Sequence, residues 1–328
     1  MASDGTGAGR PGGDDARTGA APGVLVRDFR PADADALVAV RRLVRPYHVM
    51  SPAGVAWQVA GAPAAQRFRM LVAEIDGRVV GCAGVGLAFD SSEPGQAFAH
   101  PMVHPRERGR GAGGALVAEA ERYLTDLGAT SLYTWAVTDD GSPGFAVRRG
   151  YRPLRVARYL RLDLRAAEPP APAGPPPGVE LCTAADLADD PRPFYRADVE
   201  ATLDEPGDVP SDTLSYQDWL TLYWSHPDFD RGLTTLAVAG GAVVAFATAH
   251  TDGEGGYLSA MTGTVRAHRG RGLAKLVKSH SLRLARAAGC AWAYTGNDTE
   301  NGPMLAVNAW FGYRPAGAEQ RFVTGLGG

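Results

Sequence analysis

Two stretches decide the fold of this chain: Arg108-Gly109-Arg110-Gly111-Ala112-Gly113-Gly114 and Arg269-Gly270-Arg271-Gly272-Leu273-Ala274. Each follows an apolar run, ending at Val103 or Val265, and each precedes a segment with the spacing of an amphipathic helix. Backbone N–H groups at a helix start lack partners and carry partial positive charge, and glycine lets an anion approach them closely. The repeated turns predict two phosphate-binding helix starts, although one such turn alone could equally be a plain tight turn with solvated arginines.

The segments around the two turns repeat in the same order, which indicates an internal duplication. Each half is predicted to hold a strand, a helix, a hairpin with a glycine turn, the strand before the arginine-rich turn, the helix after it, a further strand and a short helix ending in Gly-Tyr. In the first half the predicted strands and the Gly-Tyr pair are Val24–Phe29, Leu71–Ile75, Val79–Leu87, Leu132–Val137 and Gly150-Tyr151. In the second half they are Val179–Thr183, Leu236–Ala239, Val243–Ala249, Ala291–Thr295 and Gly312-Tyr313. Each half is therefore expected to be mixed α/β.

Length and charge restrict the class of protein. The 328 residues suffice for two domains, and 45% hydrophobic with 21% charged residues is typical of folded globular chains. A net charge of −3 argues against a nucleic-acid or anionic-membrane partner held by bulk electrostatics. The sequence has no apolar run of about 18 residues, and its N-terminus lacks the apolar core of a signal peptide. We therefore expect a cytoplasmic protein.

Two breaks in composition divide the chain. Residues 1–23 are rich in Gly, Ala, Asp and Arg and are predicted to form a disordered tail. Residues 166–178, AAEPPAPAGPPPG, contain six prolines and are predicted to be an extended linker. The expected domains are therefore residues 24–165 and 179–328. The three cysteines lie far apart and form neither a disulfide framework nor a metal pattern, so no metal is expected.

Two familiar phosphate loops fit the turns less well. Gly109, Gly111 and Gly114 match the spacing of the dinucleotide-binding fingerprint, but Lys275 stands at the third glycine of the second copy. The strand before each turn also comes late in its half, whereas a Rossmann turn follows the first strand. Neither turn has the Gly-Lys-Ser/Thr sequence of a Walker loop. Both alternatives are therefore rejected.

Both turns fit the pattern Arg/Gln-x-x-Gly-x-Gly/Ala that marks the GCN5-related N-acetyltransferases (GNATs). The matching residues are Arg108, Gly111 and Gly113 in the first half, and Arg269, Gly272 and Ala274 in the second. The chain resembles a tandem GNAT protein over both halves, most strongly over residues 262–313. The resemblance implies two GNAT-like domains, each with a mainly antiparallel central sheet and flanking helices, and acetyl-CoA as the co-substrate.

Carried over by position, the resemblance also implies the coenzyme-binding residues. In this family the pantetheine arm lies between the strand before the turn and its neighbour, and the turn amides bind the pyrophosphate. The implied contacts are Val103, Arg108, Gly109, Arg110, Gly111, Ala112, Gly113 and Gly114, and in the second half Thr264, Val265, Arg269, Gly270, Arg271, Gly272, Leu273, Ala274 and Lys275.

The last helix of a GNAT domain usually carries an asparagine that holds the coenzyme and, seven residues later, a tyrosine that protonates the departing thiolate. Counted back from the two Gly-Tyr pairs, these places hold Asn301 and Asn308 in the second half, and Asp139 and Ala146 in the first. The resemblance therefore favours coenzyme binding and catalysis in the second half. A carboxamide at Asn308 can hydrogen-bond a sulfur or an oxyanion, although it is not an acid.

Other polar side chains complete the expected site. Tyr257 and Asn297 are candidate catalytic residues beside Asn308, with structural roles as the alternative. The three carboxylates of Asp204–Pro210 would attract a cationic amine or form a solvated loop. We expect an acetyl-CoA-dependent N-acetyltransferase, a monomer or homodimer, that acts directly on a small amine metabolite or antibiotic. The alternative is a non-catalytic acyl-CoA-binding or scaffolding protein.

Overall fold

The computed structural model of the chain describes residues 23–91, 93–138, 141–166, 168–172, 174–204 and 214–327. The expected tail lies outside these ranges except for Gly23, and so do Asp139 and residues 205–210 of the acidic loop. Over the described ranges, none of the helices has the length and apolar character needed to span a bilayer.

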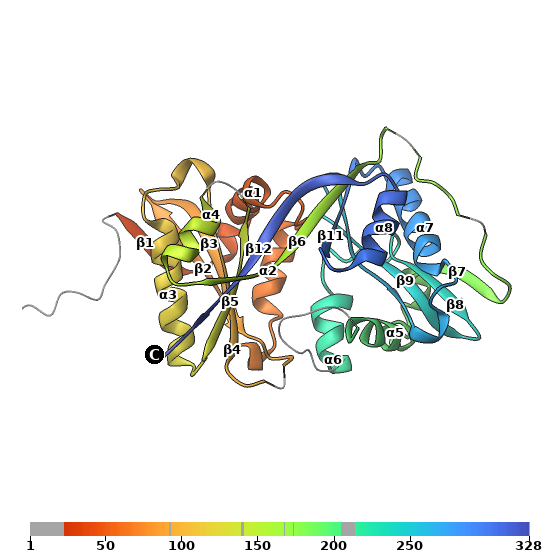
Figure 1. Ribbon diagram of the computed structural model, residues 1–328, viewed down its shortest axis with the longest axis horizontal. Helices are drawn as coiled ribbons and strands as arrows, with labels where there is room; N and C mark the ends of the chain where they lie inside the picture. The colour runs from red at the N-terminus through yellow and green to blue at the C-terminus, as the bar shows by residue number, and fades with distance from the viewer. Residues whose placement is uncertain are drawn as a thin grey trace, which may run out of the picture.

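Both halves contain the expected alternation of strands and helices (Figure 1). The first half comprises β1 (Val24–Asp28), α1 (Ala34–Val44), α2 (Pro52–Ala60), β2 (Arg69–Ile75), β3 (Arg78–Leu87), β4 (Gln96–Val103), α3 (Ala112–Asp126), β5 (Ser131–Val137), α4 (Ser142–Arg148) and β6 (Arg152–Asp163). The second comprises β7 (Val179–Thr183), α5 (Arg192–Thr202), α6 (Tyr216–Trp219), β8 (Thr235–Ala239), β9 (Ala242–Thr251), β10 (Gly256–Thr264), α7 (Leu273–Ala287), β11 (Trp292–Asp298), α8 (Gly302–Trp310) and β12 (Arg314–Gly325). The predicted α/β class is confirmed.

The hairpins β2–β3 and β8–β9 turn where the sequence places glycine. Asp76 and Gly77 have φ of +53° and +71°, and Gly240 and Gly241 have φ of +56° and +79°. A two-residue turn with positive φ at both positions matches the twist of the flanking strands. These hairpins fix the register of the strands that lead to each arginine-rich turn.

The last strand of each half crosses into the other half. The twelve strands of the described ranges form one sheet in the order β1-β2-β3-β4-β5-β12-β6-β11-β10-β9-β8-β7. Strand β12 of the second half therefore pairs with β5 of the first half, and β6 pairs with β11 of the second. Figure 1 shows β12 and β6 side by side between the two lobes. The two sheets expected from the sequence are thus joined edge to edge.

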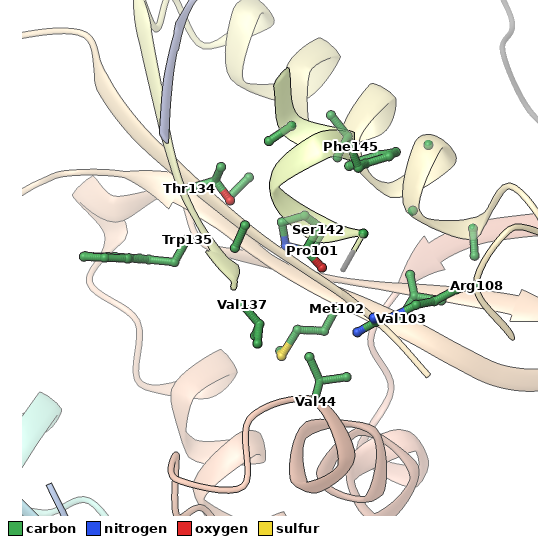
Figure 2. Close-up of a pocket in the computed structure, with 18 of the residues that line it drawn as sticks. Val44, Pro101, Met102, Val103, Arg108, Thr134, Trp135, Val137, Ser142 and Phe145 are labelled. Atoms are coloured by element: carbon green, nitrogen blue, oxygen red, sulfur yellow. The ribbon is translucent and has the colours of Figure 1, made fainter. Parts of the chain in front are cut away.

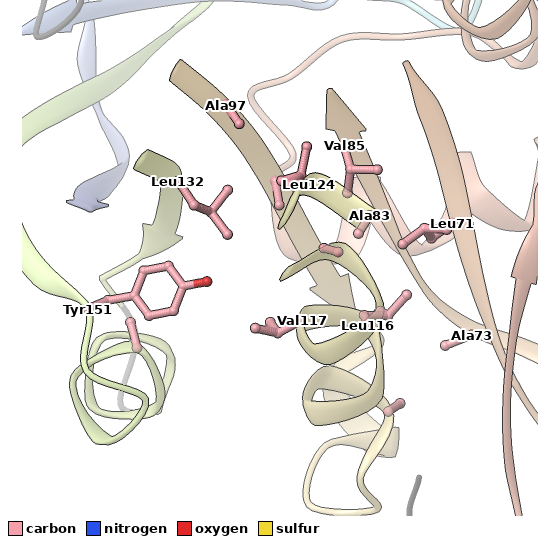
Figure 3. Packing of buried hydrophobic residues seen from close by; sticks show 14 of the residues in the cluster. Leu71, Ala73, Ala83, Val85, Ala97, Leu116, Val117, Leu124, Leu132 and Tyr151 are labelled. Atoms are coloured by element: carbon pink, nitrogen blue, oxygen red, sulfur yellow. The ribbon is translucent and has the colours of Figure 1, made fainter. Parts of the chain in front are cut away.

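The exchanged strands also carry core residues across. Phe322 of β12 is 1% exposed and packs in the first-half core with Leu132 and Tyr151, which Figure 3 labels. Leu164, directly after β6, is fully buried in the second-half core with Tyr313. Each half therefore depends on the other for part of its apolar core.

The proline-rich spacer returns the chain from the middle of the sheet to its far edge, where β7 begins. Described residues of the spacer lie against α7: the Pro170 carbonyl accepts a hydrogen bond from Ser279 Oγ at 2.6 Å, and Glu168 forms an ion pair with Arg283 at 2.6 Å. The division at residues 166–178 stays a prediction, because the sheet continues across both halves.

The strand exchange makes a crossed prediction about local stability. Truncation of a large buried side chain costs about 2–5 kcal/mol of unfolding free energy, so Phe322→Ala should loosen the first half and Leu164→Ala the second. Hydrogen exchange read by mass spectrometry on the full chain measures this. Phe322→Ala should speed exchange mainly in β3–β5, and Leu164→Ala mainly in β9–β11. Faster hydrogen exchange in β9–β11 for Phe322→Ala and in β3–β5 for Leu164→Ala would contradict the crossing of β6 and β12 between the halves.

Candidate functional site

A cavity of about 380 Å³ opens in the first half, between β4 and β5 (Figure 2). These strands run parallel but pair only over Gln96–Phe98 and Ser131–Tyr133, after which they diverge. Strand β4 lines the cavity with Pro101, Met102 and Val103, and β5 lines it with Thr134, Trp135 and Val137. The wedge between two parallel strands is therefore the origin of the cavity.

The arginine-rich turn closes one end of this cavity. Gly109 and Gly111 have φ of +80° and +93°, a region that favours glycine, and Gly111 precedes the first residue of α3. The first helical hydrogen bond runs from Ala115 N to Gly111 O, so the amides before Ala115 are available to a ligand. The turn residues that line the cavity are Arg108, Gly109, Gly111, Ala112, Gly113 and Gly114.

Arg110 is the one expected first-half residue that points elsewhere. Its guanidinium donates to Glu107, which lines the cavity, at 2.5 Å, and to the exposed Asp76 of the β2–β3 turn at 3.3 Å. The ion pairs hold the turn against that hairpin. Arg110 therefore supports the turn, whereas Arg108 lies at the cavity (Figure 2).

The walls of the cavity are mostly apolar, with Val103, Val117 and Phe145 among them. Thr134 is an exception: its Oγ1 is buried and has no hydrogen-bond partner among the described residues. A buried polar atom without a partner is costly unless a ligand or water satisfies it. A narrow apolar channel with one unsatisfied hydroxyl and free helix amides at its end suits a long ligand with an anionic head.

The second half repeats the backbone of this site. Gly270 and Gly272 have φ of +74° and +77°, and Gly272 precedes the first residue of α7. Strands β10 and β11 pair over Gly256–Leu258 and Trp292–Tyr294 and then diverge in the same way. Both turns and both wedges are therefore present, as the duplication predicts.

The side chains inside the two wedges differ. Four positions that line the first-half cavity have polar counterparts when the arginine-rich turns and the Gly-Tyr pairs are aligned. Val117, Thr134, Ala136 and Ala146 correspond to Lys278, Thr295, Asn297 and Asn308. Three small or apolar side chains are thus replaced by larger polar ones.

These polar residues form a closed hydrogen-bonded cluster. Lys278 Nζ donates to Asn308 Oδ1 at 2.7 Å and to Thr295 Oγ1 at 3.4 Å, and Asn308 Nδ2 donates to Asn297 Oδ1 at 2.5 Å. The side chains of Lys278 and Asn308 are both 0% exposed. Burial lowers the pKa of Lys278 to about 7. The amide of Asn308, expected to meet a thioester, instead satisfies a buried lysine.

The remaining polar candidates of the second half have structural contacts. Tyr257 is fully buried and hydrogen-bonds Ser281 at 2.7 Å, deep in the core. Asn301 caps α8 by accepting from Met304 N at 3.3 Å. Sequence reasoning chose Asn301 from its spacing to the Gly-Tyr pair and Tyr257 as a polar residue of the strand before the turn, and neither criterion reveals burial.

The second-half turn is held by its own charges. Arg269 donates to the Thr264 carbonyl at 3.1 Å and forms an ion pair with Asp204. Hydrogen bonds from Arg266 and Arg269 lower the pKa of Asp204 to about 2. Lys275 lies over the ring of Trp310 at 5.0 Å. The described part of the acidic loop therefore binds the turn itself.

The other expected second-half contacts divide between surface and core. Gly270, Arg271 and Gly272 are exposed, and Ala274 is partly exposed. Leu273 is 1% exposed and packs in an apolar cluster that Val265 borders. Motif spacing alone does not distinguish these surface and core positions, although alignment of the two halves pairs Lys278 with Val117 and marks the second wedge as different.

No group of three or more His, Cys, Asp or Glu side chains suited to a metal ion occurs among the described residues.

Comparisons with known proteins agree on one family. The sequence model of the acetyltransferase (GNAT) family matches residues 38–151 and 189–312. Mycothiol acetyltransferase from Nocardiopsis dassonvillei is 26% identical over 315 residues, 88% of this chain and 88% of that one. The mycothiol acetyltransferase from Geodermatophilus obscurus is 32% identical over 167 residues, 48% of this chain and 52% of that one.

Solved structures share the architecture of the whole chain. A GCN5-related N-acetyltransferase from Sphaerobacter thermophilus has a TM-score of 0.68 at 22% identity, covering 93% of this chain and 96% of its own. A tandem GNAT protein from the clavulanic acid biosynthesis pathway has the same score and identity, covering 93% and 99%. The repeated turns, the parallel wedges and both family matches lead to one conclusion: this chain is a tandem member of the GNAT family of acetyltransferases.

Proposed function

We propose that this enzyme transfers the acetyl group of acetyl-CoA to an amine of a small molecule, and that the first half holds the coenzyme. The observation that carries the assignment is the contrast between the two wedges. The first is an apolar cavity of about 380 Å³ with the unpaired Thr134 hydroxyl. In the second, Lys278, Asn297 and Asn308 form a closed cluster. This proposal replaces the second-half assignment that sequence spacing favoured.

The first-half turn suits the phosphates of the coenzyme. The unpaired amides at the start of α3 and the positive end of its dipole favour a pyrophosphate group. A Cβ at Gly113 would make only ordinary van der Waals contacts, at 3.6 Å from Val103 and 3.8 Å from Phe145, so a small residue fits at this position. The guanidinium of Arg108 adds charge at the same end of the cavity.

The main chain of β4 suits the acyl-pantetheine part. His104 N donates to Val80 O at 2.8 Å, and Ala88 N donates to Gln96 O at 2.9 Å, so even-numbered residues of β4 pair with β3. The amides of Ala99 and Val103 consequently face the wedge, and Pro101 between them has no N–H. Acetyl-CoA supplies a thioester, and an amide aimed at its oxygen would stabilise the negative charge that develops there.

In this proposal the second half contributes structure to the site. It supplies β12, which completes the sheet beside β5, and its own wedge is filled by side chains. The alternative remains an acyl-CoA-binding protein without turnover. Thiol release from acetyl-CoA in the presence of a panel of small primary amines separates the two functions, because the alternative requires binding without amine-dependent release.

Matched substitutions in the two turns test where the coenzyme binds. Gly111→Asp and Gly272→Asp place a carboxylate at equivalent positions with φ of +93° and +77°, so the backbone strain is similar. A lost charge-assisted contact costs about 1.5–3 kcal/mol, or about 10–100-fold in affinity. Calorimetry should show that loss for acetyl-CoA in Gly111→Asp and little change in Gly272→Asp. The reverse result would place the coenzyme in the second half.

The filled wedge predicts a pH-dependent stability. The pKa of Lys278 falls from 10.5 to about 7 on folding, so the unfolded chain binds one more proton between these values. The contribution of Lys278 to the free energy of unfolding should therefore rise by about 1.4 kcal/mol per pH unit between these two pKa values. Urea unfolding from pH 7 to 9.5 measures the difference between the wild type and Lys278→Met.

Lys275→Met is the matched control, because Lys275 lies one helical turn earlier on α7 and is partly exposed. The difference in the free energy of unfolding between the wild type and Lys278→Met should grow with pH. The difference between the wild type and Lys275→Met should not grow with that slope. If the free energy of unfolding changed with pH in the same way in the wild type and in Lys278→Met, the pKa of Lys278 would not be lowered in the folded protein, and the prediction would be wrong.

A further inference from the structure

A histidine on the loop between α1 and α2 lies beside the first-half cavity. His48 Nε2 is 3.1 Å from Glu319 Oε1, and the same oxygen is 3.1 Å from Nε of Arg45. Arg45 lines the cavity and donates through Nη2 to the Trp135 carbonyl at 2.8 Å. The imidazole is therefore separated from the cavity wall by one shared carboxylate.

The position of Glu319 is fixed by the exchanged strand. Glu319 of β12 is paired with Val137 of β5, and Val137 lines the cavity (Figure 2). Opposite residues of an antiparallel pair project from the same face, with Cβ atoms about 4.5–5.5 Å apart. The side chain of Glu319 is only 1% exposed. The second half thus supplies a buried carboxylate at the edge of the first-half cavity.

Aromatic rings hold the imidazole in place while one side stays open. The rings of Tyr47 and Tyr159 stack at 4.0 Å, and His48 contacts them at centroid distances of 5.2 and 5.0 Å. The side chain of His48 remains 40% exposed. The charged and titratable groups that face it are Arg41 of α1, Arg45 and Tyr47 of its own loop, His100 of β4, Tyr159 of β6 and Glu319 of β12.

The hydrogen bond to Glu319 selects one tautomer of His48. Burial raises the pKa of Glu319, but the hydrogen bond from His48 and the charge of Arg45 outweigh it and leave this pKa below 4.5. An ionised carboxylate only accepts, so Nε2 carries the proton and Nδ1 keeps its lone pair. No hydrogen bond occupies Nδ1 among the described residues. Partial desolvation by the surrounding side chains lowers the pKa of His48, despite the opposing hydrogen bond to Glu319, and this favours the neutral ring.

We propose that His48 is the general base that takes a proton from the acceptor amine, and that Glu319 is the residue that positions it. This inference rests on the proposed function. An ammonium acceptor loses one proton to His48 Nδ1, which passes it to solvent. The nitrogen lone pair forms the C–N bond at the thioester carbon, the C–S bond breaks with its electrons on sulfur, and the thiolate takes the second nitrogen proton. The products are the amide and free coenzyme A.

The test compares His48→Gln and Glu319→Gln with the wild type in the full chain. General-base catalysis contributes about 10²–10⁴-fold, so His48→Gln should lower kcat for an acetylated amine by about 100-fold or more. Its affinity for acetyl-CoA in calorimetry should stay within about twofold. The fall of kcat/KM below pH 6.5 that protonation of His48 causes (the acid limb of the pH profile) should disappear. Any fall caused by protonation of the substrate amine should remain. His280→Gln, on α7 of the second half, is the control with unchanged rates.

Glu319→Gln tests the positioning role. Loss of the carboxylate removes the interaction that raises the pKa of His48, so the acid limb should move to lower pH while kcat falls. A merely structural Glu319 would lower stability and leave the limb where it is. Glu319→Asp retains the charge, so its kcat should exceed that of Glu319→Gln, and its acid limb should stay at the wild-type pH.

Nitrogen-15 NMR of the histidines reads the tautomer without any substrate, with the His48→Gln spectrum identifying the His48 signals. The expected wild-type form at pH 7 is neutral with the proton on Nε2. A proton on Nδ1, or an active His48→Gln enzyme with an unchanged pH profile, overturns the assignment of the base. If the wild type acetylates no amine of the panel, the proposed function fails and this inference fails with it; if only the His48 results fail, the proposed function stands.

Discussion

The pairing of β12 with β5 and β6 is the interaction on which the rest of this structure depends. It joins two sheets into one, covers the edge of β5 with backbone hydrogen bonds, and delivers Phe322 to the first-half core. An edge strand left unpaired would be an aggregation hazard. The same strand places Glu319 beside the cavity, so the arrangement of the site follows from the arrangement of the sheet.

The duplicated halves show how one backbone supports two outcomes. Both have a parallel wedge that ends at a glycine turn, because strand order and turn sequence are shared. Side chains then decide what the wedge contains. Val117 leaves the first wedge open, whereas Lys278 at the same place requires partners, which Asn308 and Thr295 supply. A buried ammonium without a counter-ion is expensive, and a closed hydrogen-bonded cluster limits that expense.

Most elements could be predicted from local patterns, and the exchange could not. The Asp76-Gly77 and Gly240-Gly241 turns, the apolar runs and the two arginine-rich turns specified β1–β5 and β7–β11 closely. The strands β6 and β12 alternate in burial too weakly to reveal which sheet they join, because register with a distant partner is a tertiary property. Motif spacing likewise identified Asn308 but could not show that Lys278 occupies its carboxamide.

The position of β12 after every other described strand has a consequence for synthesis on the ribosome. The first half emerges early, yet the strand that covers β5 is made after all the other described strands. Throughout translation of the second half, β5 therefore waits with an open edge, and β6 waits for both of its neighbours. Folding of this chain cannot finish one half at a time, as domains usually do during synthesis. Completion of both halves becomes a single event that depends on the synthesis of β12.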